Sequence, residues 1–221
     1  VLNGVLMEVE KNVLKFTSTD GFRLAQRVCI LKNSVRDGVA ISIIIPMKAL
    51  QEISRIIQQE NYQDNIKIMI SKEQIAFELD SIYLISRLIQ GQFPDYKQVI
   101  PKEGKVKIIL SRKELLESAE RASIIASSNA NIIKLESAKN QLLISATTAN
   151  IGNVSELVDV QSEGTLDFPI AFNVRLLMDV LKNVDEDNVV FTLNSPSSPG
   201  VIIPKENKDY TYVLMPIRTI S

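Results

Sequence analysis

The chain contains a long internal repeat, and this feature constrains its fold more than any other. The run from Val13 to Asp20 returns as the run from Gln141 to Thr148, and the two runs align through Leu14 and Leu142 at an offset of 128 residues. The elements that follow keep their order in both copies. A repeat this long indicates two related domains, not a short-period solenoid. We predict one domain over residues 1–100 and a second over residues 101–221.

The expected elements follow the same order in both copies. The first copy predicts strands at 13–20, 43–45, 65–70, 74–79 and 83–89, and a helix at 47–58. The second predicts strands at 106–110, 132–137, 141–148, 168–173, 188–193, 200–203 and 210–217, with helices at 111–126 and after Asn173. The opening strand and helix of the second copy have no counterpart in the first. We therefore expect the sequence to be a piece of a longer chain.

Composition sets the class of protein. With 45% apolar and 23% charged residues the chain can bury a core. The longest apolar run, Val39 to Met47, is too short to span a membrane. The first residues include Glu8 and Glu10 where a signal peptide would carry positive charge, and Cys29 is the single cysteine. We expect a cytoplasmic protein with no membrane contact.

The sequence contains few candidate catalytic residues. The sequence has no histidine, which removes the commonest general base and metal ligand. Its eight glycines form no phosphate-binding loop. Carboxylates such as Glu156 and Asp159 fit a solvated strand face better than an active site. We therefore expect a protein without catalytic residues, metal or cofactor.

Basic residues recur at equivalent positions on the expected helices. Lys48 and Arg55 lie seven residues apart, and Arg175 and Lys182 repeat them at an offset of 127. This spacing places each pair on one side of its helix, opposite the apolar positions. The helix at 111–126 adds two further basic residues, Lys113 and Arg121. Simple solvation is the alternative, and Glu52 interrupts the first pair, but the repetition favours a surface that meets a phosphate backbone without reading bases.

Four local motifs resemble one family. They are Thr19-Asp20-Gly21-Phe22-Arg23-Leu24, Gly91-Gln92-Phe93-Pro94-Asp95-Tyr96, Tyr212-Val213-Leu214-Met215-Pro216-Ile217-Arg218 and the opening Val1-Leu2-Asn3-Gly4. In this order they resemble the bacterial sliding clamp, the beta subunit of DNA polymerase III, from its middle domain to its end. The resemblance implies an α+β clamp fold of repeated domains, with helices on the inner face around duplex DNA and antiparallel sheets outside. In that family two chains form a ring.

The resemblance also implies a site for short linear peptides of DNA polymerase III alpha subunit, the clamp loader, and repair or translesion polymerases. Carried over, its lining is Leu2, Thr19, Gly21, Phe22, Arg23, Leu24, Pro94, Val99, Asn173, Leu176, Pro196, Val213, Met215, Pro216, Ile217 and Arg218. Leucine, methionine and proline suit apolar peptide anchors. The homodimer contact of the family would fall on Ile124 and Ile125.

Three departures from the family pattern and two rival functions accompany this interpretation. Phe22 stands where many clamps carry histidine, and Gln98 where arginine is frequent, while Thr219-Ile220-Ser221 extend past the usual ending. One rival is a peptide-binding repeat scaffold with no nucleic-acid contact. The other is a small enzyme that uses carboxylates, for which Asp20 and Asp95 are the candidates.

Overall fold

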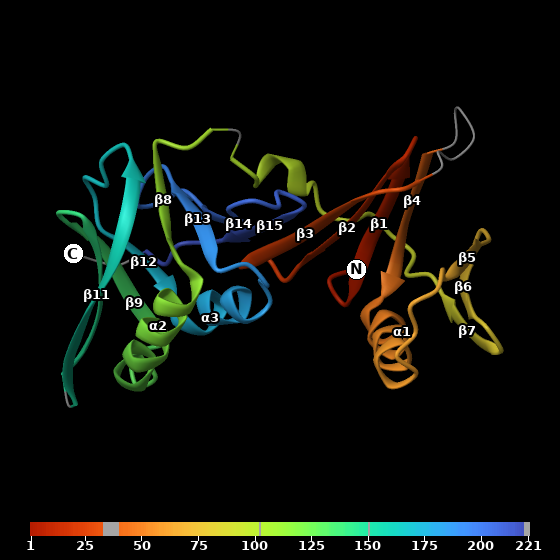
Figure 1. Ribbon diagram of the computed structural model, residues 1–221, viewed down its shortest axis with the longest axis horizontal. Helices are drawn as coiled ribbons and strands as arrows, with labels where there is room; N and C mark the ends of the chain where they lie inside the picture. The colour runs from red at the N-terminus through yellow and green to blue at the C-terminus, as the bar shows by residue number, and fades with distance from the viewer. Residues whose placement is uncertain (33–39, 102, 150, 219–221) are drawn as a thin grey trace. The chain divides into compact units, whose positions relative to one another are not determined.

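A computed structural model describes residues 1–32, 40–101, 103–149 and 151–218. Thr219-Ile220-Ser221 therefore lie outside the described residues. The chain divides into two compact units (Figure 1): the first comprises residues 1–20 and 26–94, and the second comprises residues 21–25 and those from 95 onward. Residues 21–25 thus leave the unit that surrounds them in sequence, which matters for the site described below.

The first unit contains two separate antiparallel sheets and one helix. The larger sheet has the order β3-β2-β1-β4 and the smaller the order β5-β6-β7. The strands are β1 (Gly4–Glu10), β2 (Val13–Thr19), β3 (Arg23–Ile30), β4 (Ala40–Pro46), β5 (Lys67–Ile70), β6 (Gln74–Leu79) and β7 (Ile82–Arg87). The first three residues of β3 are counted with the second unit.

Helix α1 (Met47–Gln59) follows directly from β4. Pro46 stands at its N-cap, where the absent N–H of proline removes no helical hydrogen bond. Ala49 and Ile53 are buried on its inner side and pack with Met7, Ile45 and other apolar residues of the first unit. The apolar periodicity of the sequence predicted this helix correctly, and the helix ends one residue later than expected.

The second unit contains one continuous sheet, in the order β12-β9-β10-β11-β8-β13-β14-β15. Two helices and a short 3₁₀ turn (Tyr96–Gln98) accompany it. The elements are β8 (Val106–Ser111), α2 (Arg112–Ala126), β9 (Ile132–Ala138), β10 (Gln141–Thr148), β11 (Gly152–Glu163), β12 (Ile170–Asn173), α3 (Val174–Lys182), β13 (Asn188–Leu193), β14 (Gly200–Pro204) and β15 (Tyr210–Leu214).

Both helices of the second unit begin at capping side chains. The Ser111 hydroxyl accepts a hydrogen bond from the Glu114 N–H at 3.3 Å, and the Asn173 side-chain oxygen accepts one from the Arg175 N–H at 3.0 Å. Serine and asparagine are among the residues that most often cap helix N-termini. Helices α2 and α3 lie side by side (Figure 1), joined by an ion pair of 3.1 Å between Lys182 and Glu120.

The strand order of the two units follows the sequence repeat. Strands β1 to β4 correspond to β9 to β12, α1 corresponds to α3, and β5 to β7 correspond to β13 to β15. Strand β8 and helix α2 have no counterpart among the described residues of the first unit. Antiparallel pairing with three helices is the α+β class that we predicted.

Candidate functional site

The segment 21–25 forms a turn and short strand within the second unit. Gly21 has a φ of +89°, which side-chain-bearing residues rarely adopt, and a Cβ placed there would meet nothing within 4 Å. The backbone angle therefore explains why glycine stands at this position. The turn presents Phe22, a residue that is 69% exposed. Its carbonyl accepts a 2.9 Å hydrogen bond from the Met215 N–H, so the turn is attached to the chain leaving β15.

An ion pair links the turn to α3, and a hydrogen bond links α3 to β15. The Arg23 guanidinium forms an ion pair with Asp179 on α3. The Tyr212 hydroxyl donates a 3.1 Å hydrogen bond to the Leu176 carbonyl. Burial raises the pKa of Tyr212 to about 12, and the Arg23 guanidinium opposes that rise. The turn, α3 and β15 therefore form one hydrogen-bonded assembly.

The chain after β15 supplies the apolar part of this surface. Met215, Pro216 and Ile217 are partly exposed, and the Ile217 N–H donates to the Ala171 carbonyl at 2.8 Å. These bonds explain why β15 ends at Leu214 and not at residue 217 as expected: the next N–H groups bond to the turn and to β12. We call Phe22, Leu176, Met215, Pro216 and Ile217 the docking surface.

The remaining residues assigned to the peptide site are distributed over both units. In the second unit, Leu24 and Val213 are buried, while Asn173 caps α3. Val99, Pro196 and Arg218 are exposed there. Leu2, Thr19 and Pro94 belong to the first unit, where Leu2 and Pro94 are exposed and Thr19 is partly buried.

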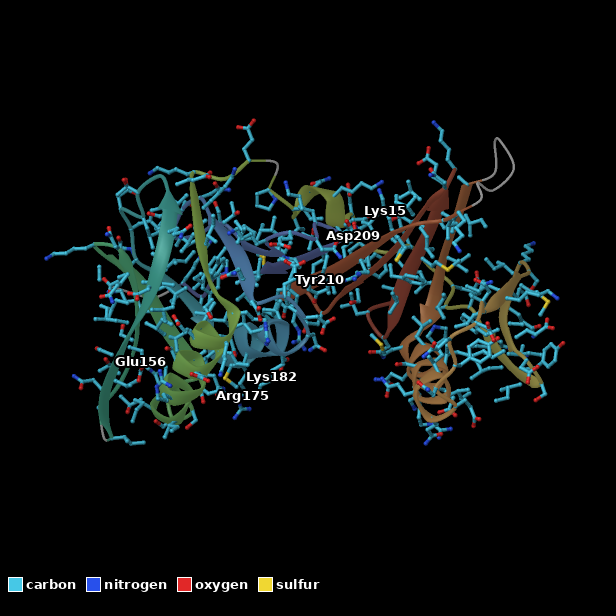
Figure 2. The ribbon with its side chains drawn as sticks, in the orientation of Figure 1. Lys15, Glu156, Arg175, Lys182, Asp209 and Tyr210 are labelled. Carbon is cyan, nitrogen blue, oxygen red and sulfur yellow. The ribbon has the colours of Figure 1, made fainter. Side chains whose placement is uncertain are left out.

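The basic residues of the helices divide into paired and unpaired groups. Four of the six have carboxylate partners: Arg55 with Glu52, Lys113 with Glu117 at 3.9 Å, Arg121 with Glu156 at 2.8 Å, and Lys182 with Glu120 at 3.1 Å. Across the described part of the chain, no carboxylate lies within 4.0 Å of the Lys48 amine or the Arg175 guanidinium. Figure 2 shows Arg175 and Lys182 on α3.

Sequence reasoning missed two of these partners. Glu156 lies on β11, and its hydrogen bond with Arg121 lowers the pKa of the Glu156 carboxyl. Glu120 lies on α2, opposite Lys182. Neither pairing has a local sequence signal, because strand and helix or two helices must first pack together. The pairing of Arg55 with Glu52, three residues apart on one helix, was visible in the sequence.

The two isoleucines assigned to a subunit contact differ in exposure. Ile124 is 70% exposed near the end of α2, whereas Ile125 is partly buried and packs on the core of the second unit. Leu157 of β11 is also exposed, an apolar surface residue that the sequence reasoning did not select.

Two family models account for nearly the whole chain. The DNA polymerase III beta subunit, central domain, matches residues 1–95, and the C-terminal domain of the same subunit matches residues 97–218. The chain is 32% identical over 220 residues to the beta sliding clamp of Staphylococcus aureus, covering 99% of this chain and 57% of that protein. It therefore spans somewhat more than half the length of the relatives it matches.

Solved structures give the same result. The DNA polymerase III beta subunit from Thermotoga maritima matches 99% of this chain and 58% of its own, with a TM-score of 0.91 and 32% identity. A Pseudomonas aeruginosa sliding clamp bound to griselimycin matches with a TM-score of 0.91 and 30% identity, over 98% of this chain and 57% of its own. The fold is that of a DNA clamp, as predicted. The chain belongs to the DNA polymerase III beta subunit family.

Among helices in the described residues, none is long and apolar enough to cross a membrane.

Proposed function

We propose that this chain supplies two repeated domains of a replication sliding clamp, a protein that encircles duplex DNA and tethers DNA polymerase III and other partners. It does so without chemistry of its own. A closed ring is retained on DNA by topology, so weak phosphate contacts suffice and tight contacts would impede sliding. Family membership and the relatives named sliding clamps support this proposal.

The structure of the docking surface is the main support for the proposal that partner proteins are tethered through short peptides. Its exposed and partly exposed apolar groups belong to segments fixed by hydrogen bonds, at Met215 to Phe22 and at Ile217 to Ala171. A surface that is ordered before binding loses less conformational entropy when a peptide docks. We assign it to short linear peptides with apolar anchors, of the kind carried by polymerases and by the clamp loader.

The basic helix residues would face DNA. Lys48 and Arg175 occupy equivalent repeat positions and have no carboxylate partner in the described structure, which makes them the strongest candidates for phosphate contact. The carboxylate beside each of the other four, Lys113, Arg121, Arg55 and Lys182, offsets its positive charge, which makes these residues weaker candidates. We assign the subunit contact of the ring, a homodimer, to Ile124 with Ile125 behind it.

A peptide titration tests the docking assignment. A fluorescent peptide of about six residues, with a glutamine followed by leucine and a terminal apolar residue, should bind with micromolar affinity, because a short ligand must offset several kcal/mol of lost freedom. Met215→Ala should weaken binding by about 1–2 kcal/mol. Met69→Ala is the matched control, since Met69 is a 38% exposed methionine of the first unit. Equal affinities for both variants and the wild type would place the peptide site elsewhere.

A further inference from the structure

One carboxylate of α3, that of Asp179, pairs with the turn that carries Phe22. Asp179 Oδ2 forms an ion pair with Arg23 Nη1, across 156 positions of sequence, so no local pattern indicates the pair. The side chains of Arg23 and Asp179 are 33% and 53% exposed. Within the part of the chain that the structure describes, Arg23 is the one basic side chain within 4.0 Å of this carboxylate. The ion pair therefore joins α3 to the turn.

Each partner of this ion pair adjoins a residue of the docking surface. Phe22 immediately precedes Arg23 in the turn. Leu176 lies three residues before Asp179 on α3, and residues three apart on a helix share a face. Phe22 is 69% exposed and Leu176 is partly buried. The Arg23–Asp179 pair thus connects the two segments that supply Phe22 and Leu176.

The Arg23 guanidinium also acts on Tyr212 of β15. A hydrogen bond from this guanidinium and its positive charge oppose the rise that burial causes in the pKa of the Tyr212 hydroxyl. The same hydroxyl donates to the Leu176 carbonyl at 3.1 Å. Asp179, Arg23 and Tyr212 therefore form a chain of polar contacts that leaves α3 at Asp179 and returns to it at Leu176.

A second polar contact attaches the turn on another side. The Phe22 carbonyl accepts a 2.9 Å hydrogen bond from the Met215 N–H, in the chain that leaves β15. This bond fixes the turn against the chain after β15, whereas the ion pair fixes it against α3. Contacts to two different elements restrict pivoting of the turn more than either contact alone. The spacing between Phe22 and Leu176 depends on the contact to α3.

The exposure of the ion pair limits how much it can do. An ion pair between partly exposed side chains changes an equilibrium by at most about fivefold. Its loss should therefore leave the fold intact, because folding depends on a much larger free energy. The same limit applies to the position of the turn, so any effect on docking should be of this size.

We propose that Asp179 is a positioning residue of the docking surface. It holds the Arg23 guanidinium, and with it the Phe22 turn, at the spacing from Leu176 that a docked peptide requires. Asp179 acts through Arg23 and does not itself touch the peptide. The inference rests on the proposed assignment of the docking surface to peptides, and it adds a residue outside the lining of that surface.

Amide hydrogen exchange in the 221-residue chain tests the positioning without any ligand. Asp179→Asn should speed exchange of the Met215 N–H, which is bonded to the Phe22 carbonyl, about two- to fivefold. The Ile217 N–H is the internal reference, because it is bonded to the Ala171 carbonyl of β12 and should exchange at the same rate in both proteins. Unchanged exchange at Met215 would overturn the proposal, whether or not a peptide binds.

Two further variants separate the ion pair from the charge. Asp185→Asn removes an exposed carboxylate just beyond α3 that has no ion pair in the described part of the chain, and it should leave exchange at Met215 unchanged. Asp179→Glu keeps a carboxylate and should restore most of the protection. Urea unfolding should give nearly equal midpoints for the two asparagine variants. Faster exchange at Met215 in both of them would overturn the proposal.

Titration with the fluorescent glutamine–leucine peptide tests whether Asp179 acts through Arg23. Asp179→Asn should weaken binding about two- to fivefold. In an Arg23→Gln background the same substitution should have no further effect, because its partner is already absent. Additive losses would show that Asp179 acts on the peptide directly and would overturn the positioning role. Faster Met215 exchange in Asp179→Asn, when even the wild type binds no peptide, would support the positioning of the turn and refute the peptide assignment.

Discussion

At the scale of the residue, Tyr212 links the fold of the second unit to pH. Its pKa is raised from 10.0 to about 12, first by burial, so the folded state holds the phenolic proton more tightly than the unfolded chain. The resulting stabilisation is present below pH 10 and is lost as pH rises towards 12. A change of two pKa units corresponds to about 2–3 kcal/mol.

Near pH 8 the free energy of unfolding of the wild type should exceed that of Tyr212→Phe by about 1 kcal/mol, because the phenylalanine lacks the hydrogen bond to the Leu176 carbonyl. Urea unfolding of both proteins should show this advantage disappear between pH 10 and 12; a constant difference would contradict the assignment.

At the scale of the element, a side-chain cap stabilises the start of helix α2. The buried positions of this helix are mainly alanine, which buries little apolar area. The hydrogen bond from the Glu114 N–H to the Ser111 hydroxyl is therefore expected to contribute measurably to stability. Ser111→Ala should lower the free energy of unfolding by about 1 kcal/mol. Ser127→Ala is the matched control, because that hydroxyl donates to the Ile124 carbonyl at the other end of the helix, where capping by serine is weak. If chemical denaturation gave equal losses for both variants, the cap would not be the cause.

At the scale of the whole molecule, the chain should bind duplex DNA weakly and with strong salt dependence. A few phosphate contacts without a closed ring give affinities on the order of 10⁻⁴ M or weaker at physiological salt. Lys48→Glu with Arg175→Glu should remove most of the binding that remains at low salt. The pair Lys139→Glu and Lys208→Glu changes the net charge equally, at exposed turn positions, and should change binding much less. Fluorescence anisotropy with a labelled duplex measures both. Similar losses in the two pairs would make the interaction a matter of net charge alone and remove support for the helix faces.

The sequence by itself determined the repeat, the helices and the family, because these depend on local periodicity and on short motifs such as Thr19 to Leu24. The tertiary structure decided the rest. It assigned residues 21–25 to the second unit and ended β15 at Leu214. It also paired Arg121 with Glu156 and Lys182 with Glu120. Each of these outcomes depends on which distant segments pack or pair together, and side-chain contacts between such segments leave no periodic signal in the chain.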